Sequence, residues 1–303
     1  MRTRLRVGTF NLGNLFAWVS VKGRRRRRRA LAVRDACGEV IRRASPDVLA
    51  LQEVSDAVAL EAFNRSYLKS AYSHLAVARG VKQGIHLAVL SKRPLIDAQS
   101  LDDLELRDED GERLVDLQRR PLTLRRHLLR VDLGFGSAKS GEDSAGRIRL
   151  YVAHLKSHRP LDRRRFEIDT AAYRRAESEA VAAQIDGDLR DGRRVILAGD
   201  FNDEDTASTL SPLMDHPSLF DPLTEDIGDP EARWTAKWRR FGRRRFDYVL
   251  LSESLRPSYV AGSVAIERRD PAAYASDHRL LSLDLRLGSA PPRPGAPGGR
   301  DDS

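Results

Sequence analysis

The chain has 303 residues, of which 41% are hydrophobic and 32% are charged, so it can bury a substantial core beneath an unusually charged surface. Its net charge of +9 and sequence pI of about 10.0 favour polyanionic partners, nucleic acid first and anionic lipid headgroups second, although heavy arginine usage throughout a proteome would raise the charge in the same way. The single cysteine, Cys37, excludes an intramolecular disulfide, and no stretch reaches the length of a membrane-spanning helix.

Residues 1–16 carry no apolar stretch ahead of the first predicted strand, so a secretory signal is not indicated. We therefore expect a cytoplasmic protein, unless the sequence derives from a longer exported precursor. No heptad pattern or large apolar stripe marks a subunit interface, and a monomer is expected.

Strands are predicted where apolar residues alternate with polar ones or form short buried runs. They cover residues 4–10, 47–52, 73–78, 85–91, 122–132, 147–154, 194–199, 246–251 and 280–287. Helical periodicity covers residues 30–44 and 167–186, and the second helix is expected to begin near Asp169 or Thr170 and to end at Gly187. Many strands and few helices indicate an α/β fold in which two packed sheets have helices outside them.

Polar residues follow the ends of several predicted strands. Asn11 follows Leu-Arg-Val-Gly-Thr-Phe, Glu53 follows Val-Leu-Ala-Leu-Gln, His154 follows Leu-Tyr-Val-Ala, and Asp200 follows Val-Ile-Leu-Ala-Gly. Because strand ends can converge on one rim of a sheet, these side chains are expected to meet in one pocket. The pattern predicts an enzyme. Since its motifs run from residue 11 to residue 278, we expect one catalytic domain over residues 1–288, followed by a disordered Pro/Gly-rich tail over residues 289–303.

The residue types suit phosphate-ester hydrolysis, which needs a cation, a positioned water and a group that stabilises the leaving oxygen. Glu53 and Asp277 are hard oxygen ligands suited to Mg²⁺. Asp200 and Asn202, expected on an extended segment, would point the same way, one accepting a proton and the other holding an oxygen.

Two histidines complete this set of candidate groups. His154 and His278 can donate to a phosphoryl oxygen, and Asp247 can keep one imidazole charged by raising its pKa. Each motif by itself is common, since Asp-x-Asn is most often a turn, so the prediction depends on their joint occurrence.

The ordered motifs are Gly-Thr-Phe-Asn-Leu-Gly-Asn-Leu-Phe, Leu-Ala-Leu-Gln-Glu-Val, Val-Ala-His-Leu-Lys-Ser, Leu-Ala-Gly-Asp-Phe-Asn-Asp, Arg-Phe-Asp-Tyr-Val-Leu-Leu-Ser and Ser-Asp-His-Arg. In these motifs the chain resembles the endonuclease/exonuclease/phosphatase superfamily, which contains deoxyribonuclease I and the exonuclease III-like repair nucleases. The resemblance spans residues 5–287. It implies a four-layered α/β sandwich, with two packed mixed β-sheets flanked by helices, and a metal-dependent hydrolase of phosphate esters.

The resemblance also implies a metal site. Glu53 looks like the main ligand of Mg²⁺, for which Mn²⁺ may substitute in the family, and Asn11 and Asp277 complete or orient that site. Repair-type members carry an acidic residue at the position of Gly13. Either a metal ligand is absent here, or Asn14 supplies one through a water, and abasic-site specialisation is not implied.

The remaining roles are carried over position by position. Asp200 resembles the residue that aligns or deprotonates the attacking water, and Asn202 and His154 resemble ligands of phosphate oxygens. His278 resembles the histidine that contacts the scissile phosphate, with Asp247 as its carboxylate partner.

Basic segments bear on the substrate. Residues 24–29 are all arginine, and residues 237–245 interleave arginines with aromatic rings. From the second region and its flank, Trp234, Trp238, Arg239 and Arg243 are predicted to contact nucleic acid; the alternative is a solvated basic loop with its aromatics packed on the sheet edge. The motif wording, closest to bacterial nuclease-type members, favours a nuclease acting on DNA or RNA.

Two other functions are open to a chain with these motifs. One is a phosphomonoesterase or a lipid phosphodiesterase of the sphingomyelin or inositol type within the same superfamily. The other is an inactive nucleic-acid-binding module, which the presence of the complete set of catalytic residues argues against.

Overall fold

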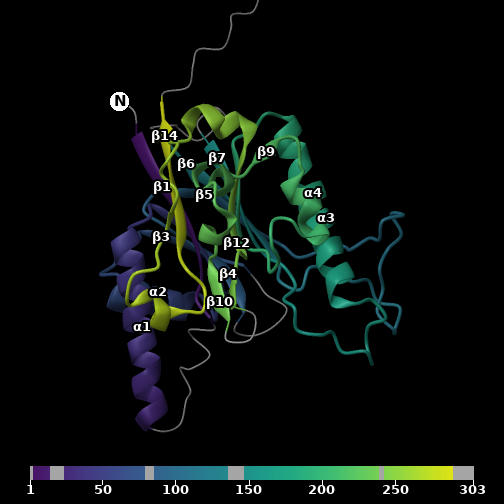
Figure 1. Cartoon of the computed structure of the whole chain (residues 1–303), viewed down its shortest axis with the longest axis horizontal. Coiled ribbons are helices and arrows are strands. Elements are labelled where there is room, and N and C mark those ends of the chain that lie inside the picture. Colours follow the sequence, from purple (N-terminus) through teal and green to yellow (C-terminus); the bar gives the residue numbers. More distant parts are fainter. Residues whose placement is uncertain (1–2, 14–23, 79–84, 136–146, 239–241, 289–303) are drawn as a thin grey trace, which may run out of the picture.

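Two six-stranded β-sheets face each other between outer layers of helices (Figure 1). This computed structural model describes residues 3–13, 24–78, 85–135, 147–238 and 242–288, without the side chains of residues 24–29. The first sheet has the order β13 (Ala265–Ile266), β14 (Leu281–Leu287), β1 (Thr3–Asn11), β2 (Val48–Val54), β4 (His86–Ser91), β3 (His74–Val77). The second has the order β5 (Leu95–Leu101), β6 (Leu128–Gly134), β7 (Arg147–His154), β8 (Val195–Asp200), β12 (Asp247–Ser252), β9 (Leu219–Phe220).

Helices cover the outer faces of the two sheets. The first sheet is covered by α1 (Arg24–Ala44), α2 (Ala57–Tyr67) and α6 (Ala272–Ala275), and the second by α3 (Thr170–Arg190) and α4 (Ser211–Met214). The short helix α5 (Pro222–Asp226) precedes a small hairpin of β10 (Ala236–Trp238) and β11 (Gly242–Arg244). Separate apolar clusters fill the space between the sheets and the space beneath each helical layer, so the four-layered α/β sandwich is confirmed.

The strand directions bring the predicted polar residues to one rim. At the centre of the first sheet β1 and β2 are parallel, and at the centre of the second β7 and β8 are parallel, so the carboxyl ends of these strands carry polar residues outward together. β12 and β14 run antiparallel to their neighbours, and their amino ends therefore reach the same rim. Strand order thus gathers residues that are far apart in the sequence.

Several boundaries differ from the sequence prediction. The strand predicted over residues 122–132 instead covers Leu128–Gly134, because the residues before it are held by isolated bridges rather than a ladder. The strand β5 and the helix α2, which begins after the N-cap Asp56, were not predicted. Residues 136–146 and 289–303, predicted as a connection and a tail, lie outside the described residues.

The two predicted helices are present, but both are longer than expected. The first begins at Arg24 rather than at residue 30, since arginine favours the helix. The second begins after Asp169, whose side chain accepts a hydrogen bond from the backbone N of Ala172, as predicted. Gly187 does not end it; the helix continues to Arg190, and the positive φ of 69° occurs at Gly192. Cys37, on the first helix, is fully buried.

One glycine permits the close approach of the strands that carry His154 and Asp200. Gly199 pairs with Ala153 across β7 and β8 and has a φ of 152°. An added Cβ there would lie 1.9 Å from the carbonyl oxygen of Ala153, far inside contact distance. No larger residue fits without displacing the strands that bear the two polar groups.

We predict that Gly199→Ala lowers the free energy of unfolding by about 3 kcal/mol or more, because the methyl group overlaps backbone. Urea denaturation measures the change. Gly187→Ala is the matched control: its Cβ would meet nothing within 4 Å, and the variant should gain up to about 1 kcal/mol from helix propensity. Equal stability of the two variants would contradict the prediction.

Candidate active site

Asn11, the last residue of β1, joins the two sheets at the rim. Its Nδ2 donates to Asp200 Oδ2 at 2.8 Å and lies 3.4 Å from Glu53 Oε1. The backbone N of Gly13 donates to Asn11 Oδ1 at 2.9 Å, which fixes the orientation of the amide. A single side chain therefore links the carboxylates at the ends of β2 and β8.

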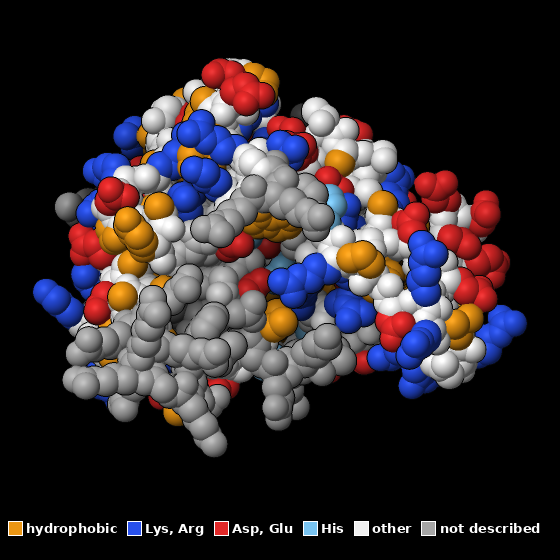
Figure 2. Space-filling model, turned by 60° about the horizontal axis from the view of Figure 1, so that its bottom comes forward, with side chains coloured by type: hydrophobic (Ala, Val, Ile, Leu, Met, Phe, Trp, Pro, Cys, Tyr) orange, Lys and Arg blue, Asp and Glu red, His pale blue; other side chains and the backbone are white. Residues whose placement is uncertain are grey.

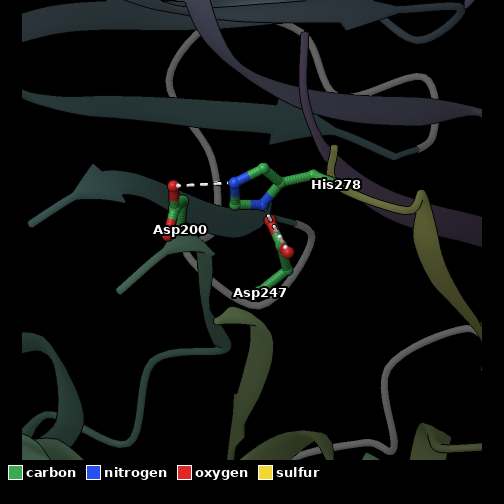
Figure 3. A group of neighbouring side chains, drawn as sticks. All are labelled: Asp200, Asp247 and His278. Atoms are coloured by element: carbon green, nitrogen blue, oxygen red, sulfur yellow. Dashed lines mark hydrogen bonds and ion pairs between the residues drawn. The ribbon is translucent and has the colours of Figure 1, made fainter. Parts of the chain in front are cut away.

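His278 lies between two carboxylates, as Figure 3 shows. Its Nδ1 is 2.8 Å from Asp247 Oδ2, and its Nε2 is 3.7 Å from Asp200 Oδ2. All three side chains are at most 4% exposed. Asp247 and Asp200 are register partners in the antiparallel pair β12–β8, so the sheet sets their separation, and the segment before β14 supplies the imidazole.

The pKa values of His278 and Asp200 give these two residues different roles. Burial alone would lower the pKa of His278, but Asp247 and Asp200 outweigh it and raise the pKa to about 10. Burial raises the pKa of Asp200 to about 7, aided by Asp247 and Glu53 and opposed by His278 and Asn11. At neutral pH the site holds an imidazolium beside a carboxylate that can accept a proton.

His154, at the end of β7, differs from His278. Its Nε2 is 3.4 Å from Asp200 Oδ2, yet burial, together with the charges of Arg126 and His278, keeps its pKa well below the ordinary value. Its buried Nδ1 has no hydrogen-bond partner among the described residues. The lowered pKa makes His154 the neutral histidine of the two.

Asn202 lies beside Asp200, but not on an extended segment as predicted. β8 ends at Asp200, and Asn202 has a φ of 56°. Its backbone N donates to Asp200 Oδ1 at 2.9 Å, and its Nδ2 donates to the carbonyl of Leu155 at 3.0 Å. This turn supports the carboxylate of Asp200 and ties it to the segment after His154.

The residues present fit a hard divalent cation at Glu53. Glu53 is half-buried and has a φ of 62° at a β-bulge in β2, and its carboxylate lies 3.4 Å from the amide nitrogen of Asn11. Asp200, Asp247 and His278 offer ligand atoms within 4.8 Å of one another, but a protonated imidazole has no lone pair for a metal. Glu53 is therefore the better candidate.

Asp277 is exposed and lies against the turn after β1. Its Oδ1 is 3.4 Å from Ser276 Oγ, which donates to the backbone carbonyl of Asn11 at 2.8 Å. Gly13 has a φ of 61°, and a Cβ there would be 3.2 Å from Ser276 Oγ and 3.5 Å from Asp277 Oδ1. Asp277 thus occupies space next to a position that cannot carry an acidic residue without strain. Asn14 is outside the described residues.

Sequence reasoning missed two charged residues near the site, the half-buried Arg126 and the buried Glu177. Arg126 Nη1 donates to the carbonyl of Leu155 at 2.9 Å, and Glu177 accepts backbone hydrogen bonds from Arg125 and Lys156. These hydrogen bonds fix the segment before β6 and the segment after β7. Arg126 fell inside a predicted strand, and Glu177 has an ordinary helical position, so neither carried a signal of burial.

The predicted substrate contacts lie near the hairpin β10–β11. The ring of Trp234 is covered by guanidinium groups, including that of Arg243 at 4.9 Å, and Trp238 packs against Phe246 with ring centroids 5.0 Å apart. Arg239 lies outside the described residues. Figure 2 shows, on the face carrying the rim, a hollow with acidic and histidine side chains in it and Lys and Arg side chains beside it. Contact with a substrate stays a prediction for these residues.

Residues 8–278 match the model of the Endonuclease/Exonuclease/phosphatase family. The chain belongs to this family. It is therefore a hydrolase of phosphate esters, and its family depends on divalent metals. No curated protein matches the chain significantly. Among the described residues, no helix is long and apolar enough to cross a membrane.

Solved structures agree with this assignment at the level of the fold. Truncated TDP2 from Caenorhabditis elegans has a TM-score of 0.62 at 17% identity, covering 94% of this chain and 98% of its own. A family member from Beutenbergia cavernae has a TM-score of 0.62 at 19% identity, covering 96% of this chain and 73% of its own. The human Nocturnin catalytic domain has a TM-score of 0.58 at 17% identity, covering 93% and 96%.

We predict that Asp247→Asn lowers the pKa of His278 from about 10 to near or below its ordinary value of 6.5, because burial then acts with less opposition. In the parent protein the ring stays charged through neutral pH, whereas in the variant it is neutral there. NMR titration of the metal-free protein measures this. Asp97→Asn, on the distant strand β5, is the control. An unchanged titration of His278 would contradict the pairing.

Proposed function

We propose that this protein is a Mg²⁺-dependent nuclease that hydrolyses phosphodiester bonds in DNA or RNA. The observation that supports it most is the buried group Asp247–His278–Asp200 at the same rim as the cation candidate Glu53. It supplies a proton acceptor and a fixed positive charge next to one another, which in-line displacement at phosphorus requires.

Each residue then has a distinct task. Asp200 orients the attacking water and accepts its proton, since burial raises its pKa to about 7. His278 presents its charged ring to the developing negative charge on phosphorus, and Asp247 keeps that ring charged and oriented. Asn202 and the neutral His154 hold phosphate oxygens.

Glu53 and Asp277 hold the cation in this proposal, and Asn11 orients Glu53. The bound Mg²⁺, or Mn²⁺ in its place, offsets charge on the phosphoryl oxygens. Carboxylate oxygens are the ligands that Mg²⁺ prefers, and an exposed Asp277 leaves room for water and substrate oxygens.

A polynucleotide is favoured over a small ester by charge. The chain carries +9, and basic side chains lie beside the hollow at the rim. A polyanion gains from this positive field at every phosphate, whereas a neutral sphingolipid tail gains nothing from it.

Supercoiled plasmid is the first substrate to test, with Mg²⁺ and with EDTA. We expect nicking or degradation that requires the metal, and a loss of about 10³-fold or more in turnover for Asp200→Asn and for His278→Ala, because each acts in the transition state. Glu61→Gln, an exposed carboxylate on α2, is the control and should retain turnover. Plasmid left intact by the folded parent protein would redirect the search to phosphomonoesters and sphingomyelin.

Metal binding is a separate expectation. Glu53→Gln should weaken Mn²⁺ binding by at least about 10-fold, because the amide lacks the charge of the ligand it replaces. Calorimetric titration measures the dissociation constant, again with Glu61→Gln as the control. Unchanged affinity in Glu53→Gln would move the cation away from Glu53.

A further inference from the structure

Three guanidinium groups gather around the indole ring of Trp234. The Cζ atoms of Arg268, Arg243 and Arg279 lie 4.5, 4.9 and 5.4 Å from the ring centroid. Trp234 directly precedes the hairpin β10–β11, Arg243 lies on β11, and Arg279 follows the catalytic His278. The three arginines and the ring are called the Trp234 cluster below.

None of the three arginines has an ion pair with a carboxylate within the described part of the chain. Their neighbours on the hairpin behave differently: Arg244 is 3.7 Å from Glu204, and the buried Arg245 pairs with Asp205 and Asp221. Of these three successive arginines, Arg243 lies in the cluster and the next two meet carboxylates. Among the described residues no carboxylate forms an ion pair with the cluster, and only those of the catalytic pocket act on it at longer range, through Arg279.

The environment of Arg268 is unfavourable for its positive charge. Burial lowers the pKa of Arg268, and repulsion from Arg243 and Arg279 lowers it further. Its Nε is buried with no hydrogen-bond partner among the described residues. Burial also lowers the pKa of Arg279, and the carboxylates of Asp277 and Asp247 partly offset that effect. Both carboxylates belong to the catalytic pocket. A bound anion would offset the positive charge and could accept the hydrogen bond that Arg268 Nε lacks.

Two of the arginines are held in place without an anion. Arg279 Nη1 donates to the carbonyls of Ser276 and His278, each at 2.8 Å, and Arg268 Nη2 donates to the carbonyls of Ala232 and Trp234 at 2.5 and 2.8 Å. Arg243 is exposed, with no carboxylate partner in the described regions, and can close on a ligand. The cluster thus combines two guanidinium groups anchored to backbone carbonyls with one exposed guanidinium.

The cluster adjoins the catalytic pocket through the backbone. Ala236 forms a β-bridge with His278, and the backbone N of Arg279 donates to the carbonyl of Thr235 at 2.6 Å. The start of the hairpin and the segment that carries Arg279 therefore border the position of a phosphate held at His278.

We propose that the Trp234 cluster binds a second phosphate of the substrate, adjacent to the one that is cleaved, with Arg243 as the group that closes on it. This inference rests on the proposed nuclease function and names a contact for it. It also changes the role predicted for Trp234: its ring organises arginines instead of stacking on a base. The same chemistry could be met by a neighbouring phosphate of a polynucleotide or by the second phosphate of a small bisphosphate.

The test compares Arg243→Ser with Arg244→Ser, which removes the same charge from the next residue. For a short oligonucleotide, KM of Arg243→Ser should rise about 10-fold relative to the parent protein, and the salt slope of binding should fall by about 1. On bis(p-nitrophenyl) phosphate, which has one phosphate, its KM should rise far less. Arg243→Lys should recover part of the loss, and Arg244→Ser should match the parent protein.

An oligonucleotide with a neutral methylphosphonate beside the scissile phosphate tests whether the cluster binds the neighbouring phosphate of a polynucleotide or only the second phosphate of a small bisphosphate. For the parent protein, KM should rise on this oligonucleotide as much as it rises for Arg243→Ser on the ordinary one. For Arg243→Ser, the methylphosphonate should raise KM little further. Equal KM for both serine variants, or an unchanged salt slope, would overturn the proposal.

Failure of the nuclease proposal is distinguishable from failure of this one. If the parent protein cleaves no polynucleotide, the nuclease function falls, and titration with inorganic pyrophosphate, followed through tryptophan fluorescence, then tests the cluster. Saturable binding that Arg243→Ser loses and Arg244→Ser keeps would support an anion site for small bisphosphates. Absent binding, or equal binding by both variants, would overturn it.

Discussion

The hydrogen bond from Asn11 to Asp200 is the contact on which the site depends, because it joins the two sheets at the rim. His278, on the segment before β14, adds a second polar contact between the sheets through Asp247, and the apolar side chains between them fix their distance but not a particular polar geometry. The amide also reaches toward Glu53, so the cation candidate and the proton acceptor are held by one residue. A small shift of one sheet against the other would therefore alter both groups together.

Burial gives these polar groups their chemistry. A carboxylate placed in the interior would be costly alone, but Asp200 accepts hydrogen bonds from Asn11 and from the backbone of Asn202, with the imidazolium of His278 nearby. The same burial raises its pKa toward neutrality and lowers that of His154. Two histidines at one rim thus hold different charges, because only His278 is hydrogen-bonded to a carboxylate, that of Asp247.

The arginines of this basic chain are of two kinds: some pair with carboxylates and others do not. Arg149 binds Asp132 and Asp188, and Arg174 binds Asp203, so these arginines hold the second sheet and α3 together. Arg268 and Arg243 lie in the Trp234 cluster without such partners among the described residues. Net charge alone does not separate these groups, and only the second kind is available to a polyanion.

The sequence by itself determined the strands that end in Asn11, Glu53, His154 and Asp200, because alternation and apolar runs are local properties, and with them the fold and family. It also indicated the pairing of His278 with Asp247. Only the tertiary structure decided the left-handed turn at Asn202, the hydrogen bonds of Arg126 and Glu177, and the placing of Arg243 over Trp234. Those features depend on contacts between residues distant in the chain, and no local periodicity reports which arginine will meet a carboxylate and which will not.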